Sequence, residues 1–366
     1  MSEIKIPVSS PLFNGKEKEY VMDCLDSTWI SSNGKYINGF EDAYARYCGV
    51  SRAVACCNGT VALHLALICC GILPGDEVLI PSLTFVATAN AVLYCGAIPV
   101  FVDSDPDTWN INVEDMKTKI TEKTKAVIAV HLYGNPCDMS AITETAEEYG
   151  LSVIEDAAEA HGAEYKGRRI GSLSDAAAFS FYGNKIITCG EGGMVVTDNR
   201  ELADRVSLIK GQGMSPDRRY WFECMGYNYR MTNIAAALGM AQLEQIEVFL
   251  AKRREIYNLY RNNLCNDSVM FQIDQPDALN ACWMFSVLID VSEEERDRFM
   301  MELAGKGIET RPVFYPMHRL PYLKKYARGE CRCAENIASG GINLPTWPGL
   351  SRDNIEYVCD SLRNLL

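Results

Sequence analysis

The sequence has few of the residues and motifs that metal enzymes, dinucleotide-binding folds and membrane proteins need. Its four histidines, among 366 residues, are too scattered to predict a metal site. It lacks Gly-x-Gly-x-x-Gly, Gly-x4-Gly-Lys-Ser/Thr and Gly-x-Ser-x-Gly, which argues against a nicotinamide-dependent dehydrogenase, a P-loop kinase and an α/β-hydrolase. No apolar run approaches the length of a transmembrane helix, so we expect no membrane segment.

Basic residues are also fewer than acidic ones. There are 35 Lys and Arg against 48 Asp and Glu, a formal net charge of −13, which argues against binding to nucleic acid or to an anionic membrane surface. The 15 cysteines are odd in number and include the adjacent pairs Cys56-Cys57 and Cys69-Cys70, so a disulfide framework is not expected. Residues 1–7 show no apolar signal core. We therefore expect a cytoplasmic protein with reduced, mostly buried cysteines.

From about residue 53 to 200, the chain alternates short apolar runs with helical patterns. This alternation is typical of a mainly parallel sheet covered by helices on both faces, so the predicted fold class is α/β. Two of the runs, 176–181 and 194–197, have no room for a helix between them and predict an antiparallel pair. The other predicted strands are 53–57, 77–81, 98–102, 126–130 and 153–155.

A different pattern begins near residue 234. Residues 234 to about 263 are periodic and rich in helix-forming residues, which predicts one long helix leading into a second domain. The remainder reads as α+β, with a strand over 283–289, a helix over 293–305 and a terminal helix from Arg352. We expect a large domain over 1–245 and a smaller one over 246–366, with the N-terminal segment able to pack on the small domain.

Residues with chemical potential follow several of the predicted strands. Gly59 and Thr60 begin a helix, Asp156 ends a strand, Lys185 follows a buried strand, and a glycine-rich turn lies at 190–193. Each has an ordinary alternative: a helix cap, a second cap, an exposed loop lysine and a simple turn. Ligands bind at the carboxyl ends of such strands. Together with an aromatic loop at 84–85, the four features supply what pyridoxal 5′-phosphate requires: a phosphate anchor, ring stacking, a carboxylate for the ring nitrogen and a Schiff-base lysine.

At these residues the chain resembles the nucleotide-sugar aminotransferases, a family of fold-type I pyridoxal phosphate enzymes. The resemblance runs from about Trp29 to His318 and implies a large domain with a seven-stranded mixed sheet between helices. The matching segments are Gly59-Thr60-x-Ala62-Leu63, Gly75-Asp76-Glu77-Val78, Thr84-Phe85-x-Ala87-Thr88, Val130-His131-Leu132-Tyr133-Gly134, Glu155-Asp156-Ala157-Ala158, Ser180-Phe181-x3-Lys185, Gly190-Glu191-Gly192-Gly193, Gly226-x-Asn228-Tyr229-Arg230-Met231 and Arg311-Pro312-x3-Pro316-x-His318.

The resemblance implies roles for the residues around the cofactor ring. Lys185 is expected to form the Schiff base and to move the proton during transamination. Asp156 is expected to pair with the ring nitrogen, and Phe85 to stack on the ring. Glu159 matches a position that hydrogen-bonds near the phenolic oxygen of the cofactor. Many members of the family carry Gln or His there, so its role is less firmly implied.

The same resemblance implies a phosphate site that two subunits share. Gly59, Thr60 and Ser180 are expected to hold the phosphate. Asn228 is expected to reach the phosphate of the neighbouring subunit's cofactor. The implied assembly is therefore a homodimer with shared active sites.

Further segments, including Leu25–Ser32 and Thr310–His318, resemble members that act on GDP-4-keto-6-deoxy-D-mannose with L-glutamate as amino donor, in the synthesis of O-antigen and other surface polysaccharides. The candidate substrate-binding residues are Arg219, Tyr220, Arg230, Arg311 and His318. Arginine suits a diphosphate because its guanidinium group donates hydrogen bonds in pairs. Each of these residues is equally compatible with an ordinary surface or interface position.

Three alternatives remain beside this interpretation. A UDP- or dTDP-linked 4-keto sugar is the first, because sequence separates nucleotides poorly. A dehydratase branch of the family carries His where this chain has Lys185, so the lysine favours amino transfer. A non-catalytic regulator that binds pyridoxal phosphate is disfavoured by the intact set of Lys185, Asp156 and Ser180.

Overall fold

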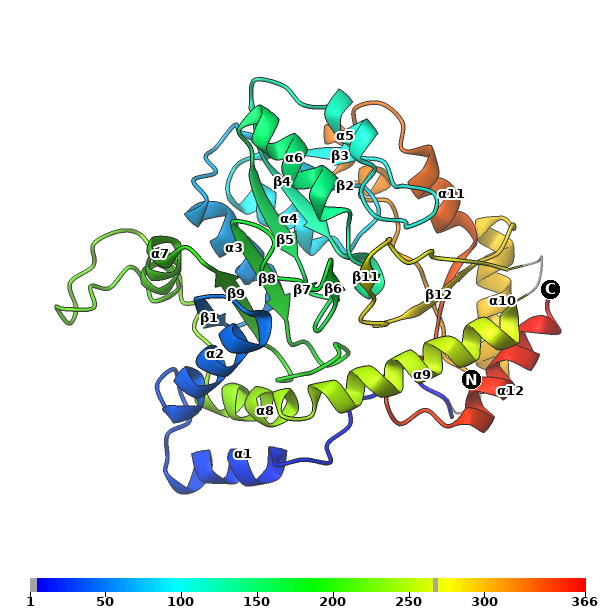
Figure 1. Ribbon diagram of the computed structural model, residues 1–366, viewed down its shortest axis with the longest axis horizontal. Coiled ribbons are helices and arrows are strands. Elements are labelled where there is room, and N and C mark those ends of the chain that lie inside the picture. The colour runs from blue at the N-terminus through cyan, green and yellow to red at the C-terminus, as the bar shows by residue number, and fades with distance from the viewer. Residues whose placement is uncertain (1–4, 266–268) are drawn as a thin grey trace.

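The computed structural model describes residues 5–265 and 269–366 (Figure 1). Within them the largest sheet has seven strands in the order β1-β9-β8-β5-β4-β2-β3. β9 runs antiparallel to both of its neighbours, whereas the other pairs are parallel. The predicted mixed α/β sheet is therefore confirmed, including the antiparallel pair. The bounds are Arg52–Cys56 (β1), Glu77–Pro81 (β2), Ile98–Val102 (β3), Thr124–Val130 (β4), Ser152–Asp156 (β5), Ala176–Ser180 (β8) and Gly193–Thr197 (β9).

The apolar strand sequences fit this sheet because helices cover both of its faces. Every residue of β2, β8 and β9 is buried, as expected for strands without a solvated face. In Figure 1, α6 lies in front of the sheet and α3 and α4 lie behind it. The helices of this part are α1 (Glu17–Asp26), α2 (Lys35–Cys48), α3 (Gly59–Cys69), α4 (Ala87–Tyr94), α5 (Val113–Thr118), α6 (Met139–Tyr149) and α7 (Arg200–Lys210), with a 3-10 turn at Leu132–Gly134.

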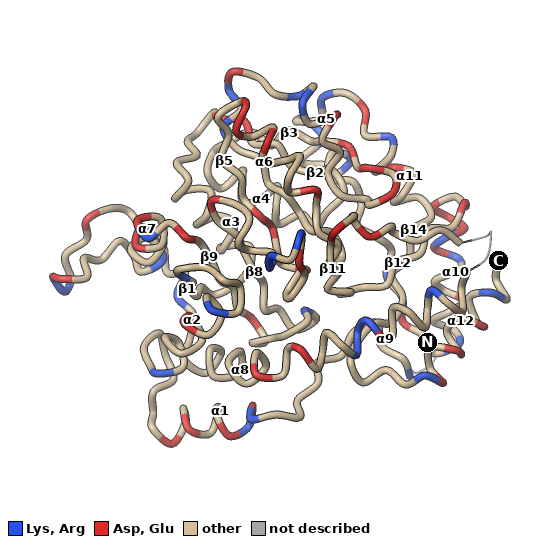
Figure 2. Tube along the Cα trace, viewed as in Figure 1, with Lys and Arg blue, Asp and Glu red and all other residues tan. Residues whose placement is uncertain are grey.

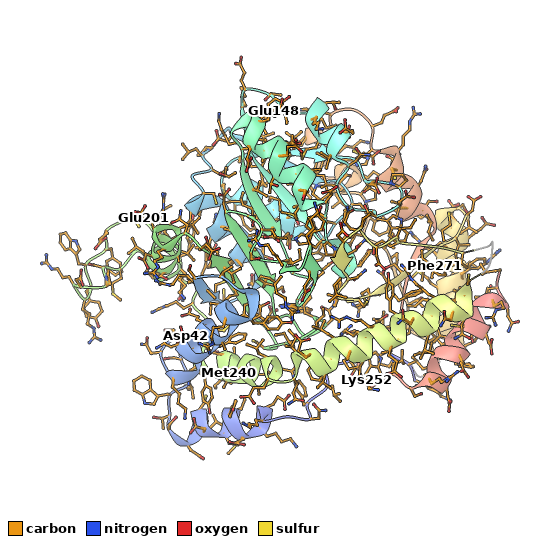
Figure 3. All side chains as sticks on the ribbon, in the orientation of Figure 1. Asp42, Glu148, Glu201, Met240, Lys252 and Phe271 are labelled. Atoms are coloured by element: carbon orange, nitrogen blue, oxygen red, sulfur yellow. The ribbon has the colours of Figure 1, made fainter. Side chains whose placement is uncertain are left out.

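The prediction of a single long helix from residue 234 is wrong in one respect. The structure divides it into α8 (Asn233–Leu243) and α9 (Ile246–Leu264), which meet at an angle of 60°. Met240 lies on α8 and Lys252 on α9 (Figure 3). α8 packs against α1 and α2, whereas α9 packs against the C-terminal helix α12 (Arg352–Arg363), so the two pieces must point in different directions. Among the described residues, no single helix is long and apolar enough to cross a membrane.

The C-terminal part is built on a second, antiparallel sheet in the order β10-β12-β14-β13. The strand expected over 283–289 is present as β12, and the predicted helices at 293–305 and from Arg352 are confirmed as α10 and α12. The remaining elements are β10 (Met270–Phe271), β12 (Phe285–Leu288), α10 (Glu293–Gly305), β13 (Arg311–Pro312), α11 (Arg332–Gly340) and β14 (Gly341–Leu344), with 3-10 turns at Met317–Arg319 and Lys324–Tyr326. A third small sheet joins β11 (Ala278–Leu279) to β6 (Glu164–Tyr165) and β7 (Arg168–Arg169).

The division into 1–245 and 246–366 is kept as a proposal, and the packing of the core supports it. A separate hydrophobic cluster forms around Tyr260, Phe285 and Val358 in the C-terminal part. Ile6, from the N-terminal segment, belongs to the same cluster and forms a bridge with Ile308. The segment 313–338 nevertheless contributes to the larger cluster around the seven-stranded sheet, so the two parts share an extensive contact.

Candidate active site

A cavity of about 510 Å³ lies where the carboxyl ends of the parallel strands face the C-terminal part. Its floor consists of residues at the carboxyl ends of β1, β5 and β8. β5 and β8 are neighbours in the sheet, and β9 alone separates β8 from β1. Its opposite wall consists of 283–284, 311–314 and Asn343. The site predicted at the strand ends therefore exists, and segments from the C-terminal part of the chain complete it.

One end of the cavity is suited to an anion. Asn58 caps α3 by accepting a hydrogen bond from the Val61 backbone N–H at 3.0 Å, and Gly59 and Thr60 then present the first turn of the helix to the cavity. Free backbone N–H groups and the positive end of the helix dipole favour a phosphate there. A Cβ atom on Gly59 would lie 2.6 Å from the Cβ of Ser180, so only glycine allows this close approach.

A buried histidine fixes the backbone at Ser180. His161 Nε2 lies 2.7 Å from the Ser180 carbonyl oxygen, and His161 Nδ1 lies 2.6 Å from the Tyr44 hydroxyl. Burial lowers the pKa of His161 to about 3, so the ring stays neutral. A carbonyl oxygen can only accept, so Nε2 carries the proton and Nδ1 accepts from Tyr44. Sequence analysis gave neither residue a role, since Tyr44 is 117 positions from His161.

Asp156 is the last residue of β5 and is buried at the floor of the cavity. The Thr88 hydroxyl donates to its Oδ2 at 2.7 Å, and the Ala158 backbone N–H donates to its Oδ1 at 3.3 Å. Burial raises the pKa of Asp156, and the Thr88 hydrogen bond opposes that rise by stabilising the carboxylate. Thr88 is thus a functional candidate that the motif contained but to which the sequence assigned no role.

Lys185 lies in the loop that follows β8, and its amine is enclosed. Its Nζ lies 3.6 Å from Glu159 Oε1 and 3.9 Å from the centre of the Trp283 ring. Glu159 Oε2 accepts a hydrogen bond from the Tyr133 backbone N–H at 2.8 Å. Burial lowers the pKa of Lys185, and burial raises the pKa of Glu159 to about 7. The site thus holds a lysine that loses its proton more readily than an exposed one, which is what a nucleophilic amine requires.

The mouth of the cavity carries aromatic and basic groups. Phe85 is 56% exposed, and its ring centre lies 5.8 Å from that of Phe314. Arg311 lines the same side and pairs with Glu309 at 3.2 Å. Sequence analysis gave no role to Trp283 or Phe314. Both line the cavity because the fold brings the C-terminal part against the strand ends.

Eight of the predicted site residues thus line one cavity: Gly59, Thr60, Phe85, Asp156, Glu159, Ser180, Lys185 and Arg311. Four others lie on or at the base of an arm, residues 211–230, which leaves the body after α7 (Figures 1 and 3). Asn228 and Arg230 sit at its base, where they form bridges with Gly211 and Cys56. Arg219 and Tyr220 are at the middle of its sequence, and Figure 2 shows both basic and acidic residues on the arm. None of these four lines the cavity of its own chain.

His318 is also placed outside the lining of the cavity. Its Nδ1 lies 2.6 Å from the Ser82 hydroxyl oxygen, and its Nε2 lies 2.9 Å from Glu335 Oε1. It therefore joins the end of β2 to α11. The contact of His318 with substrate stays a prediction, and its bonds to Ser82 and Glu335 do not support it.

The lining residues fit pyridoxal phosphate. A helix start for the phosphate, a buried carboxylate for the ring nitrogen, an aromatic side chain and an enclosed lysine occur in one cavity of suitable size. With the mixed seven-stranded sheet and the smaller C-terminal part, they define a pyridoxal phosphate-dependent enzyme of fold type I.

Comparison with known proteins specifies the family. Residues 12–363 match the DegT/DnrJ/EryC1/StrS aminotransferase family, and the chain belongs to it. It is 52% identical to GDP-perosamine synthase of Escherichia coli O157:H7, covering 98% of this chain and 97% of that protein. It is 48% identical to GDP-perosamine synthase of Caulobacter vibrioides, covering 100% of each. The crystal structure of S. venezuelae DesV matches with a TM-score of 0.91 at 35% identity, covering 95% of this chain and 94% of that one.

These comparisons confirm the resemblance found in the sequence and the fold that it implied. The protein is a pyridoxal phosphate-dependent aminotransferase. A relative named pleiotropic regulatory protein, from Geobacillus stearothermophilus, is 35% identical over 94% of each chain, which is lower than the identity to the two GDP-perosamine synthases.

The Thr88–Asp156 hydrogen bond predicts a pH effect. In Thr88→Val the Asp156 carboxylate loses a donor, so its pKa rises further and it takes up a proton at a higher pH than in the parent protein. We expect kcat to fall by about 10-fold, since a hydrogen bond to a charged group contributes about 1.5–3 kcal/mol. The acidic limb of the pH–rate profile should move to higher pH.

The matched control for this variant is Thr143→Val on α6, which removes a hydroxyl that bonds the Met139 carbonyl oxygen at 2.7 Å, away from the cavity. It should leave the profile unchanged. An acidic limb that stays in place in Thr88→Val would show that Thr88 does not tune Asp156.

Proposed function

We propose that this aminotransferase moves the amino group of L-glutamate to C4 of GDP-4-keto-6-deoxy-D-mannose, giving GDP-perosamine and 2-oxoglutarate for a surface polysaccharide such as O-antigen. The observation that carries the proposal is the identity of 48–52% to two GDP-perosamine synthases over almost the entire chain. The cavity supports it, because it combines a site for the cofactor with a mouth open to a larger substrate.

The residues of the chain have distinct tasks in this reaction. Pyridoxal phosphate, when bound, supplies an electron sink for the carbon that loses a proton. Asp156 keeps the ring nitrogen protonated by offering a buried negative charge. Lys185 Nζ, with its lowered pKa, would take the proton from the α-carbon of the donor and deliver it to the cofactor carbon on the other side of the amino nitrogen. Ser180 and the start of α3 hold the phosphate, which keeps the reacting atoms in place while the amine moves.

The charge of the cavity supports a dimer. The lining from one chain carries two basic residues, Lys185 and Arg311, against three acidic ones, Asp156, Glu159 and Glu191. A sugar nucleotide and glutamate are both anionic, so this lining alone is poorly suited to capture them. More positive charge must come from elsewhere if these substrates are to bind.

The arm of a second copy can supply that charge. It carries Arg218, Arg219 and Arg230 against Asp217 and Glu223, which leaves a small positive excess. It also has exposed apolar residues, among them Tyr220 at 72% and Met225 at 82% exposure. Exposed aromatic groups of this kind mark interaction surfaces. In the proposed homodimer, Asn228 of each subunit reaches the cofactor phosphate of the other, and Arg219, Tyr220 and Arg230 contact its substrate.

We also propose a cytoplasmic location. The described cysteines are all free, including the adjacent pairs and the exposed Cys224 and Cys265. Free thiols in this number fit a reducing compartment.

The nucleotide is tested by offering the protein L-glutamate with the GDP-, UDP- and dTDP-linked 4-keto-6-deoxy sugars and identifying products by mass spectrometry. We expect the 4-amino product from the GDP substrate, with kcat/KM at least about 10-fold above the other two, because a base pocket discriminates by a few kcal/mol. A product from the UDP or dTDP sugar alone would assign the enzyme to the alternative substrate.

The shared site is tested by mixing two inactive variants. Lys185→Ala removes the amine, and Asn228→Ala removes the proposed phosphate contact from the arm. If arms cross between subunits, each mixed dimer contains one site with both residues intact, so an equal mixture regains about a quarter of the parent activity. The two variants are unfolded, mixed and refolded together. A mixture that remains inactive would show that Asn228 contributes to the site of its own chain.

A further inference from the structure

Trp283 contacts the reactive lysine from the C-terminal part of the chain. It lies just before β12, is 4% exposed and lines the cavity. The Lys185 Nζ atom lies 3.9 Å from the centre of its ring. At this distance the electron-rich face of an indole attracts an ammonium group, and the attraction is greatest where both are desolvated.

The same side chain also fixes the backbone that carries the lysine. Its indole Nε1–H donates to the carbonyl oxygen of Asn184 at 2.8 Å, and Asn184 is the residue before Lys185. The backbone of Trp283 is held in turn, because its N–H donates to the Tyr133 carbonyl oxygen at 3.1 Å and its carbonyl oxygen accepts from Arg253 Nη1 at 2.8 Å. The ring is therefore a rigid support beneath the lysine.

We propose that Trp283 is a positioning residue for Lys185. The indole face holds the Lys185 amine whenever the amine is not joined to the cofactor. The indole N–H holds the loop that carries Lys185, through the Asn184 carbonyl oxygen. During transamination the amine must leave the cofactor carbon and stay within reach of it as the proton moves. The ring provides a place where the free amine stays within the cavity. This proposal rests on the aminotransferase reaction and not on which sugar nucleotide is the substrate.

Glu159 and Trp283 act on the amine in the same direction. The carboxylate lies 3.6 Å from Nζ and the ring 3.9 Å from it, and both favour the ammonium form over the neutral amine. Burial opposes them and lowers the pKa of Lys185. Several charged or titratable groups surround the Lys185 amine and the Trp283 ring. They are Asp156, Glu159, His161, Tyr133, Glu191, Arg253 and Arg311.

Removing the ring should therefore make Lys185 easier to deprotonate. Leucine keeps an apolar side chain over the amine, so Trp283→Leu removes the attraction of the ring while the burial of the amine is largely retained. The pH at which half of the amine is neutral should therefore fall by about one pH unit, the shift that corresponds to one desolvated cation–π contact. Trp283→Phe keeps a smaller aromatic face and loses the N–H donor, so its midpoint should lie closer to that of the parent than the midpoint of Trp283→Leu does. Its uptake of cofactor should be slower, because the loop that carries Lys185 is less firmly held.

The test measures how fast the cofactor-free, full-length protein takes up pyridoxal phosphate, across a range of pH, from the visible absorbance that appears when Lys185 joins the cofactor. Only the neutral amine reacts, so the profile reports the titration of Lys185. Free pyridoxal phosphate titrates identically for every variant, and neither glutamate nor a sugar nucleotide is present. Failure of the proposed substrate would therefore leave this measurement unaffected.

The matched control is Trp347→Phe, which removes an indole N–H that donates to the Pro7 carbonyl oxygen at 3.1 Å in the C-terminal part. It should reproduce the parent profile. Circular dichroism establishes that each variant is folded, and Trp283→Met, which fills the space without a ring, replaces Trp283→Leu if the latter is not. The proposal is overturned if the ringless variant has the midpoint of Trp347→Phe, or if Trp283→Phe takes up the cofactor as fast as the parent.

Discussion

Desolvation of the Lys185 amine is the constraint on which the site depends. An exposed lysine is protonated at neutral pH and cannot attack a carbonyl group, so the fold must enclose it. Enclosure has a cost, because a buried charge needs partners. Glu159 and the face of Trp283 are those partners, at 3.6 and 3.9 Å. Burial raises the pKa of Glu159 to about 7 and lowers the pKa of Lys185, so burial acts against the charged form of both groups. This balance between burial and charged partners fits the proposed roles of Lys185 as nucleophile and proton carrier.

The architecture provides that enclosure from two sides. The strand ends of the seven-stranded sheet supply the anion site, Asp156 and the lysine loop, while the antiparallel part supplies Trp283, Phe314 and Arg311. α9 connects the two, and its buried Arg253 bonds the carbonyl oxygen of Trp283. The position of the C-terminal part and the environment of the catalytic amine are therefore linked through one side chain. The arm after α7 lies outside this arrangement (Figure 1), which fits the proposal that it contacts a second copy.

Sequence alone predicted the features that depend on local pattern. Buried strands appear as apolar runs such as Val78–Pro81, and the residues that follow them must lie at one edge of a parallel sheet, so Gly59, Asp156 and Lys185 could be placed together. Features that depend on packing were not predictable. The break between α8 and α9 arises because each packs on a different partner, and Trp283 meets Lys185 across a separation of 98 positions. His318 is the last residue of a matching motif, yet its place beside Ser82 and Glu335 is decided by tertiary structure.

The central claim, that Lys185 is the residue that joins the cofactor, is tested most directly by peptide mapping. The protein loaded with pyridoxal phosphate is treated with borohydride, which makes the link between amine and cofactor permanent, and its peptides are analysed by mass spectrometry. The account predicts that the cofactor's mass is attached to the peptide containing Lys185, in a yield close to one per chain. Attachment to another lysine, or a protein that carries no cofactor after reduction, would contradict it.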